Sequence, residues 1–219
     1  CFFYPFLKKN SEKKAFFQSD SNNLEKIIPD SINPSCEIND ENNFSSSLSS
    51  LKEITINIPD SRAWNKNLFE AKASPKINIT KKHKKKYNSE IIFKGPRNKF
   101  CKLPAKVRIS GDWKDHIKLD GNNIISSLDV KLLKGNINGI IKFKLFLPET
   151  RNGSSEVITS FLLQKMGYLA PRTKLVNVNL NSANHLMIFQ EKAAKELLEF
   201  NKLRESTIIE SDESLLWEM

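Results

Sequence analysis

Cationic side chains alternate with apolar ones along two segments that favour β-strand. In residues 102–110, Lys106 and Arg108 are expected to share one face, opposite apolar residues. In residues 128–132, Lys131 is expected to lie on the face opposite the apolar side chains. A phosphate group carries dense negative charge, and a cation fixed on a rigid strand stabilises it without reorganisation. Arg108 and Lys131 are therefore candidate phosphate ligands, and the alternative is that both simply face solvent.

The charge of the chain is unevenly distributed. The formal net charge is +10 over 219 residues. Residues 51–199 carry 28 Lys and Arg against 13 Asp and Glu, whereas both ends are mildly acidic. This distribution favours an anionic partner, although it would also serve solubility alone.

Residues 154–200 are the most clearly patterned stretch. Apolar residues at helical spacing predict a helix after Ser154, and Gly167 is expected to end it in a left-handed conformation. A strand that alternates around Val176–Leu180, a hairpin connection at Asn181–Asn184 and a continuous apolar strand follow. The second strand leads into Glu191 and a final helix. Glu191, at a strand end, could orient a lysine or simply begin that helix.

Upstream segments predict further strands and one helix, so the fold class is α+β. We expect a mostly antiparallel, twisted sheet with two or three packed helices. Residues 1–50, rich in Ser, Asn, Asp, Glu and Lys, are expected to form a flexible linker. The ordered domain is expected over residues 51–200, and residues 201–219 to form an acidic and apolar tail.

Several short motifs, in order, resemble the CotH family of atypical, kinase-like proteins, which is named after a spore coat protein. Ala170–Thr173, Asn181 and Glu191 occupy the places of the family's Pro-Arg turn, strand-ending Asn and strand-ending Glu. Arg108–Trp113 fits an Arg-x-x-Gly-Asn-Ser motif, with Asp112 in place of Asn. Asn181 is followed by Ser rather than the family's usual Gly.

Two further positions extend the resemblance over roughly residues 52–200. Asp129–Lys131 stands where the family has Arg-x-Lys, and Arg151 fits an arginine before the long helix. The resemblance implies a kinase-like N-terminal lobe that binds ATP with Mg or Mn and phosphorylates a protein substrate. It implies cofactor-binding roles for Arg108, Lys131, Glu191 and Arg151. The metal-binding carboxylates and the base are expected in a second lobe, so the chain taken alone is expected to lack activity.

Other functions remain open. The sequence contains no P-loop, no Gly-x-Gly-x-x-Gly loop and no His-Arg-Asp or Asp-Phe-Gly motif. A kinase would act on an acidic or Ser/Thr-containing protein substrate. The alternative is a non-catalytic envelope or surface-assembly protein that binds an acidic partner through its basic face. Lys81–Lys86 is expected to be a solvated loop rather than a nucleic-acid site, because it lacks interleaved aromatic residues.

The cysteines and the termini bear on location. Three cysteines and three histidines without metal-ligand spacing exclude a zinc site. Cys36 and Cys101 could pair in an exported protein, although we favour two unrelated thiols. Residues 1–7 could be the remnant of a signal or anchor, and an envelope or secreted location is favoured over a cytoplasmic one. Leu215–Trp217 is expected to pack on a following lobe.

Overall fold

The fold was analysed in a computed structural model, which describes residues 35–36, 48, 50–95, 100–121 and 123–209. These residues all belong to one compact unit, residues 33–219. The predictions for a linker over residues 1–50 and for packing of Leu215–Trp217 fall almost entirely outside the described residues.

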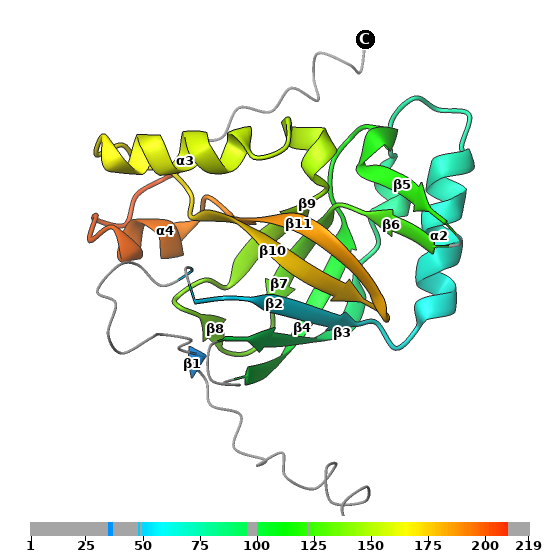
Figure 1. The fold of residues 1–219 in the computed structure, drawn as a ribbon, viewed down its shortest axis with the longest axis horizontal. Helices are drawn as coiled ribbons and strands as arrows, with labels where there is room; N and C mark the ends of the chain where they lie inside the picture. Colours follow the sequence, from blue (N-terminus) through cyan, green and yellow to red (C-terminus); the bar gives the residue numbers. More distant parts are fainter. Residues whose placement is uncertain (1–34, 37–47, 49, 96–99, 122, 210–219) are drawn as a thin grey trace, which may run out of the picture. The chain divides into compact units, whose positions relative to one another are not determined.

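Seven strands form a closed barrel at the centre of this unit (Figure 1). Every neighbouring pair is antiparallel except the one that closes the barrel, in which β2 lies parallel to β10. In spatial order the strands are β10 (Thr173–Leu180), β11 (Ala183–Glu191), β9 (Lys142–Phe146), β7 (Leu128–Leu132), β4 (Phe100–Ile109), β3 (Tyr87–Lys94) and β2 (Glu53–Asn57).

The barrel interior is filled by the apolar half of each alternating strand. Three phenylalanines from different strands meet there. The Phe143 ring stacks on Phe189 at a centroid distance of 4.6 Å and meets Phe93 edge-on at 6.0 Å. Because the side chains alternate, the polar residues of the same strands are placed on the outer surface of the barrel.

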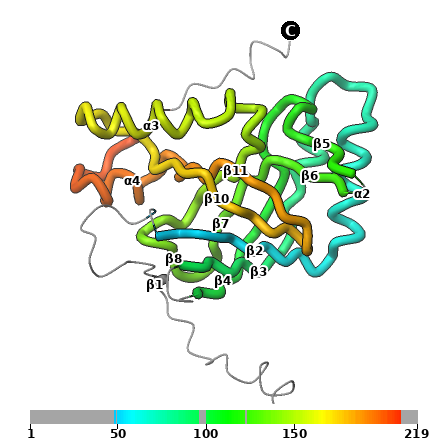
Figure 2. The backbone as a smooth tube through the Cα atoms, in the orientation of Figure 1, coloured from blue at the N-terminus to red at the C-terminus, as the bar shows by residue number. Residues whose placement is uncertain are grey.

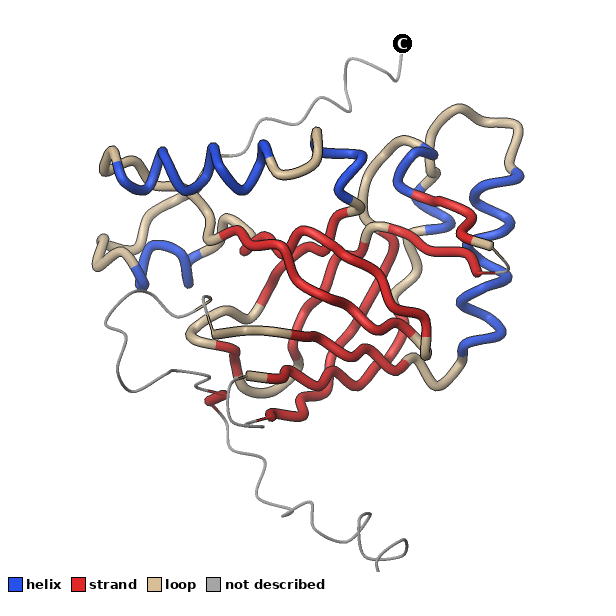
Figure 3. The backbone as a smooth tube through the Cα atoms, viewed as in Figure 1, coloured by secondary structure: helices blue, strands red, loops and turns tan. Residues whose placement is uncertain are grey.

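Two smaller strand pairs and a helix flank the barrel (Figures 2 and 3). Helix α2 (Ser61–Ala73) has Asp60 as its N-cap, and the Asp60 carboxylate accepts a hydrogen bond from the Ala63 N–H. It packs near the hairpin of β5 (Ile117–Asp120) and β6 (Asn123–Ser126). The other pair joins β1 (Ser35–Cys36) in parallel to β8 (Asn136–Ile137).

Helix α3 (Ser155–Lys165) is followed by Gly167 in the predicted left-handed conformation, with φ +83°. Its apolar stripe is largely exposed: Phe161 and Met166 are 55% and 69% accessible, and Ser160 is its one buried residue. Helix α4 (Lys195–Phe200) follows β11, and the short 3₁₀ helices are η1 (Lys81–His83), η3 (Lys114–His116) and η4 (Pro148–Arg151).

The predicted α+β class, the three α-helices of the described residues and the mostly antiparallel sheet are confirmed. The main sheet is closed on itself, and the sequence analysis did not predict this closure. The predicted hairpin is also tighter than expected, because Leu180 already pairs with Ala183. Asn181 and Ser182 make its two-residue turn, with φ of 47° and 74°, as such turns require.

Candidate anion-binding groove

A hollow of about 400 Å³ lies on the outer surface of the barrel, over β4, β7 and β9. Three lysines stand side by side across these strands, since Lys106 is in register with Lys131 and Lys131 with Lys142. We call these three residues the lysine row. This hollow, which we call the groove or the first hollow, is lined by Lys86, Lys106, Arg108, Asp129, Lys131, Leu133, Lys142, Lys192, Ala193 and Ala194.

The lysine row is an unfavourable arrangement for folding. Like charges directly opposite each other on neighbouring strands destabilise a sheet. Within the described residues, neither the three lysines nor Lys86 forms an ion pair. Among the described residues that line the hollow, Asp129 is the one acidic residue. An anionic ligand would relieve the repulsion, so the row fits a phosphate or carboxylate site.

The next row of the sheet pairs Arg108 with Asp129. The Arg108 Nε lies 2.9 Å from the Asp129 Oδ2, and its Nη2 donates to the same oxygen. The Lys192 Nζ lies 4.0 Å from that oxygen. Asp129 therefore fixes the guanidinium beside the lysine row, a role that the sequence analysis had considered for Glu191 and a lysine.

A second hollow of similar size adjoins the first, and Arg108, Asp129 and Lys192 line both. Arg151 lines this second hollow and not the first, with its guanidinium 4.2 Å from the centre of the Phe146 ring. His116 forms part of the wall, and its Nδ1 lies 2.9 Å from the Ser127 Oγ. Burial lowers the pKa of His116, which keeps the imidazole neutral near pH 7.

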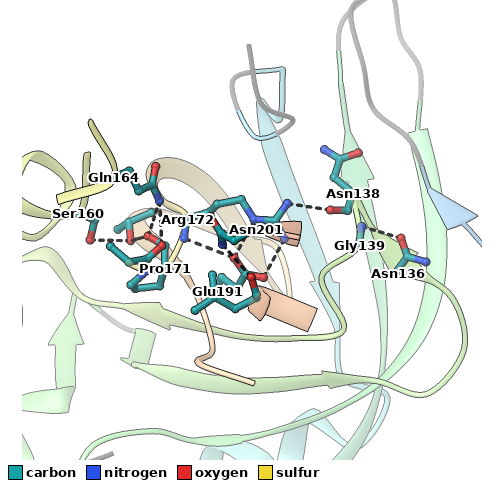
Figure 4. Close-up of polar contacts among 12 residues, drawn as sticks. Asn136, Asn138, Gly139, Ser160, Gln164, Pro171, Arg172, Glu191 and Asn201 are labelled. Carbon is teal, nitrogen blue, oxygen red and sulfur yellow. Dashed lines mark hydrogen bonds and ion pairs between the residues drawn. The ribbon is translucent and has the colours of Figure 1, made fainter. Parts of the chain in front are cut away.

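Glu191 does not line either hollow. It continues the inward-facing series of Met187 and Phe189 and is only 2% exposed. Its carboxylate receives two hydrogen bonds of 2.7 Å from the Nε and Nη2 of Arg172 (Figure 4). Arg172 also donates from Nη1 to the Asn138 carbonyl and stacks on Phe200 at 3.8 Å. Glu191 thus orients a buried arginine at one end of the barrel, rather than a lysine of the groove.

Of the four residues expected to bind a cofactor, the structure brings Arg108 and Lys131 together, places Arg151 in the adjoining hollow and sets Glu191 apart. The sequence analysis missed Lys106, Lys142 and Lys192 as members of the groove. The signal for Lys106 and Lys142 was their place on the outward face of alternating strands. They form a row because of the register between β4, β7 and β9, which the sequence pattern within a single strand does not predict.

The Lys81–Lys86 segment is more ordered than a solvated loop. The carbonyl of His83, which is buried, accepts a hydrogen bond of 2.8 Å from the Asn67 side chain. Lys84 pairs with Asp112 in the second hollow, and Lys86 reaches the first. Part of this charge run therefore contributes to the candidate site.

Three further findings describe the surroundings of the groove. Among the described residues, no group of three or more His, Cys, Asp or Glu is placed to hold a metal ion. None of the helices described reaches the length and apolar character needed to cross a membrane. Cys101 is disulfide-bonded, which corrects the expectation of a free thiol at that position; its partner side chain lies outside those described.

A scan of the chain against protein-family models finds no match, and a search among curated proteins finds no match either.

Proposed function

We propose that the lysine row binds the phosphates of a nucleoside triphosphate, and that the protein is the N-terminal, ATP-binding part of a CotH-like atypical protein kinase. The observation that carries the proposal is the row of Lys106, Lys131 and Lys142, which forms no ion pair with the described residues and lies beside an arginine fixed by Asp129. Cations held on neighbouring strands are preorganised for several oxygens of one polyphosphate, which supports affinity without rearrangement of the backbone.

The groove offers a different contact to each part of such a ligand. The lysine row and Arg108 would hold phosphate oxygens, while Leu133, Ala193 and Ala194 supply apolar surface at the same hollow for a base. ATP with Mg or Mn supplies the transferable phosphoryl group and the charge that balances it. The residues of this chain bind and orient, and the metal-binding carboxylates and the base belong to a second lobe.

Titration of the purified chain with ATP, followed by calorimetry, tests the proposal. Lys131→Ala is expected to weaken ATP binding about tenfold or more, because a hydrogen bond to a charged group contributes about 1.5–3 kcal/mol. Lys76→Ala is the matched control, since Lys76 is exposed and lines neither hollow. Equal ATP affinity in the two variants would remove the lysine row from the proposal.

The second candidate function is a non-catalytic envelope or surface-assembly protein whose basic groove binds an acidic protein. The disulfide at Cys101 favours it, because disulfides persist mainly in exported proteins and oxidising compartments. The same titration separates the two functions. The alternative predicts binding of an acidic protein that ATP does not displace, with the same loss in Lys131→Ala.

A further inference from the structure

The second hollow differs from the first in its charge. Besides Lys84, Lys144 and Arg151, its wall carries Asp112 and Asp115. Lys84 is tied to Asp112, and Arg108 and Lys192 are engaged with Asp129. The wall therefore combines a cationic part around Arg151 with an acidic part around Asp115, where the first hollow is almost uniformly cationic.

The Arg151 guanidinium lies against an aromatic ring. Phe146 is 1% exposed, and its fixed ring supports the guanidinium at 4.2 Å. The buried Arg151 Nε has no hydrogen-bond partner in the described part of the chain, and Arg151 forms no ion pair there. The aromatic contact holds the planar guanidinium in place, and a carboxylate of a ligand can pair with its terminal nitrogens.

Another part of the wall is formed by Gly111, Trp113 and Asp115. Gly111 has φ +91°, and a Cβ there would lie 2.0 Å from the His116 ring, so the close packing of His116 requires glycine at this position. Beside it, the Trp113 side chain is 40% exposed and lines the hollow, where it offers a flat apolar surface. Asp115 can accept hydrogen bonds from peptide N–H groups.

We infer that the second hollow binds an acidic segment of the acceptor protein, with Arg151 paired to a carboxylate of that segment. This inference rests on the proposed function, because it places the acceptor next to the nucleotide phosphates. Asp115 would repel the dense negative charge of a second triphosphate or of a nucleic-acid backbone, whereas a peptide can pair one carboxylate with Arg151 and donate N–H groups to Asp115. The residues shared by both hollows, Arg108, Asp129 and Lys192, make the two ligands neighbours.

The test uses the full chain and a fluorescein-labelled peptide that contains one Ser flanked by Glu on both sides. Arg151→Ala is expected to weaken binding of this peptide about tenfold or more, by loss of a charge-assisted contact. Arg151→Lys, which keeps the charge but not the planar fork, is expected to recover only part of the affinity. Arg204→Ala, at an exposed arginine outside both hollows, is the matched control.

Two further measurements locate the peptide. ATP affinity is expected to stay within twofold in Arg151→Ala, and emission from Trp113 is expected to change with peptide and not with ATP. Unfolding curves of both Arg151 variants establish that they remain folded. A folded Arg151→Lys variant with unchanged peptide affinity would contradict recognition by the planar guanidinium group.

Unchanged peptide affinity in Arg151→Ala overturns the inference, as does stronger binding of a single-stranded oligonucleotide than of the peptide. Peptide binding that depends on Arg151 in a chain that fails to bind ATP would reject the proposed function and leave the second hollow as a peptide site. ATP binding in a chain whose peptide binding does not depend on Arg151 would support the proposed function and reject the second hollow as the peptide site.

Discussion

Glu191 and Lys192 are neighbours in sequence but belong to opposite regions of the barrel. Glu191 points inward, where it is paired with Arg172 and buried. Lys192 lines the groove, where its backbone N–H donates to the carbonyl of Lys142. At one end of the same sheet, the charges inside the barrel are thus paired and shielded from water. The charges on its outer surface are in excess and exposed to solvent.

This difference distinguishes the buried charges that stabilise the fold from the exposed charges that are available to a ligand. A buried charge that loses its partner costs far more than an exposed one, because water cannot replace the partner. An exposed row of like charges is mildly unfavourable and gains only from an anion. Three predictions test this division, and they follow in order of expected size.

Arg172→Ala is expected to destabilise the protein by about 3–5 kcal/mol, because it leaves the Glu191 carboxylate buried and unpaired. Urea unfolding against Arg204→Ala, an exposed arginine, measures the effect. The double variant Arg172→Met with Glu191→Leu is expected to recover most of the loss, since an apolar pair of similar volume removes both charges. A single variant as stable as the control would show that the pair does not anchor the barrel end.

Acid is expected to weaken the fold through His116. Its pKa is lowered in the folded state, chiefly by burial, so below its usual value of 6.5 the unfolded chain binds the proton first. Stability is therefore lost as the pH falls below 6.5, by at most about 1.4 kcal/mol per pH unit for one proton. Urea midpoints at pH 7.5 and 5.5 measure this loss, which should be smaller in His116→Asn. An equal loss in that variant would assign the acid response to other groups.

Lys131→Glu is expected to stabilise the apo protein slightly. The new carboxylate would face Lys106 on one side and Lys142 on the other, and each opposite-charge pair contributes about 0.2–1 kcal/mol. The same change should abolish ATP binding. Thermal unfolding at low and high salt gives the first quantity, and added salt should erase the gain. A destabilised variant would mean that the lysine row is not under repulsion.

Local patterns predicted much of the secondary structure but not the closure of the sheet. The strand periods and the left-handed Gly167 depend on residues within a few positions of one another, and both are confirmed. The parallel pairing of β2 with β10 joins segments more than 100 residues apart, and nothing in either strand specifies it. Closure also turns Glu191 from a strand-end residue into an interior one.

The site was predicted in part for the same reason. Alternation placed Arg108 and Lys131 on outward faces, and the register brought them to one groove. Lys142 shows the same alternation, but only the three-strand register turns it into part of a row. Arg151 depends on stacking against Phe146, which a linear pattern does not encode.

The parallel contact between β2 and β10 has a consequence for folding of the protein during its synthesis. Residue 53 leaves the ribosome long before residue 180. Strand β2 can therefore pair with β10 only after β10 has been synthesised. Contacts of such long sequence separation are slow to form, and they leave an unsatisfied strand edge while synthesis continues. Nascent chains arrested before β10 are therefore the stage at which this protein is most exposed to aggregation and to capture by chaperones.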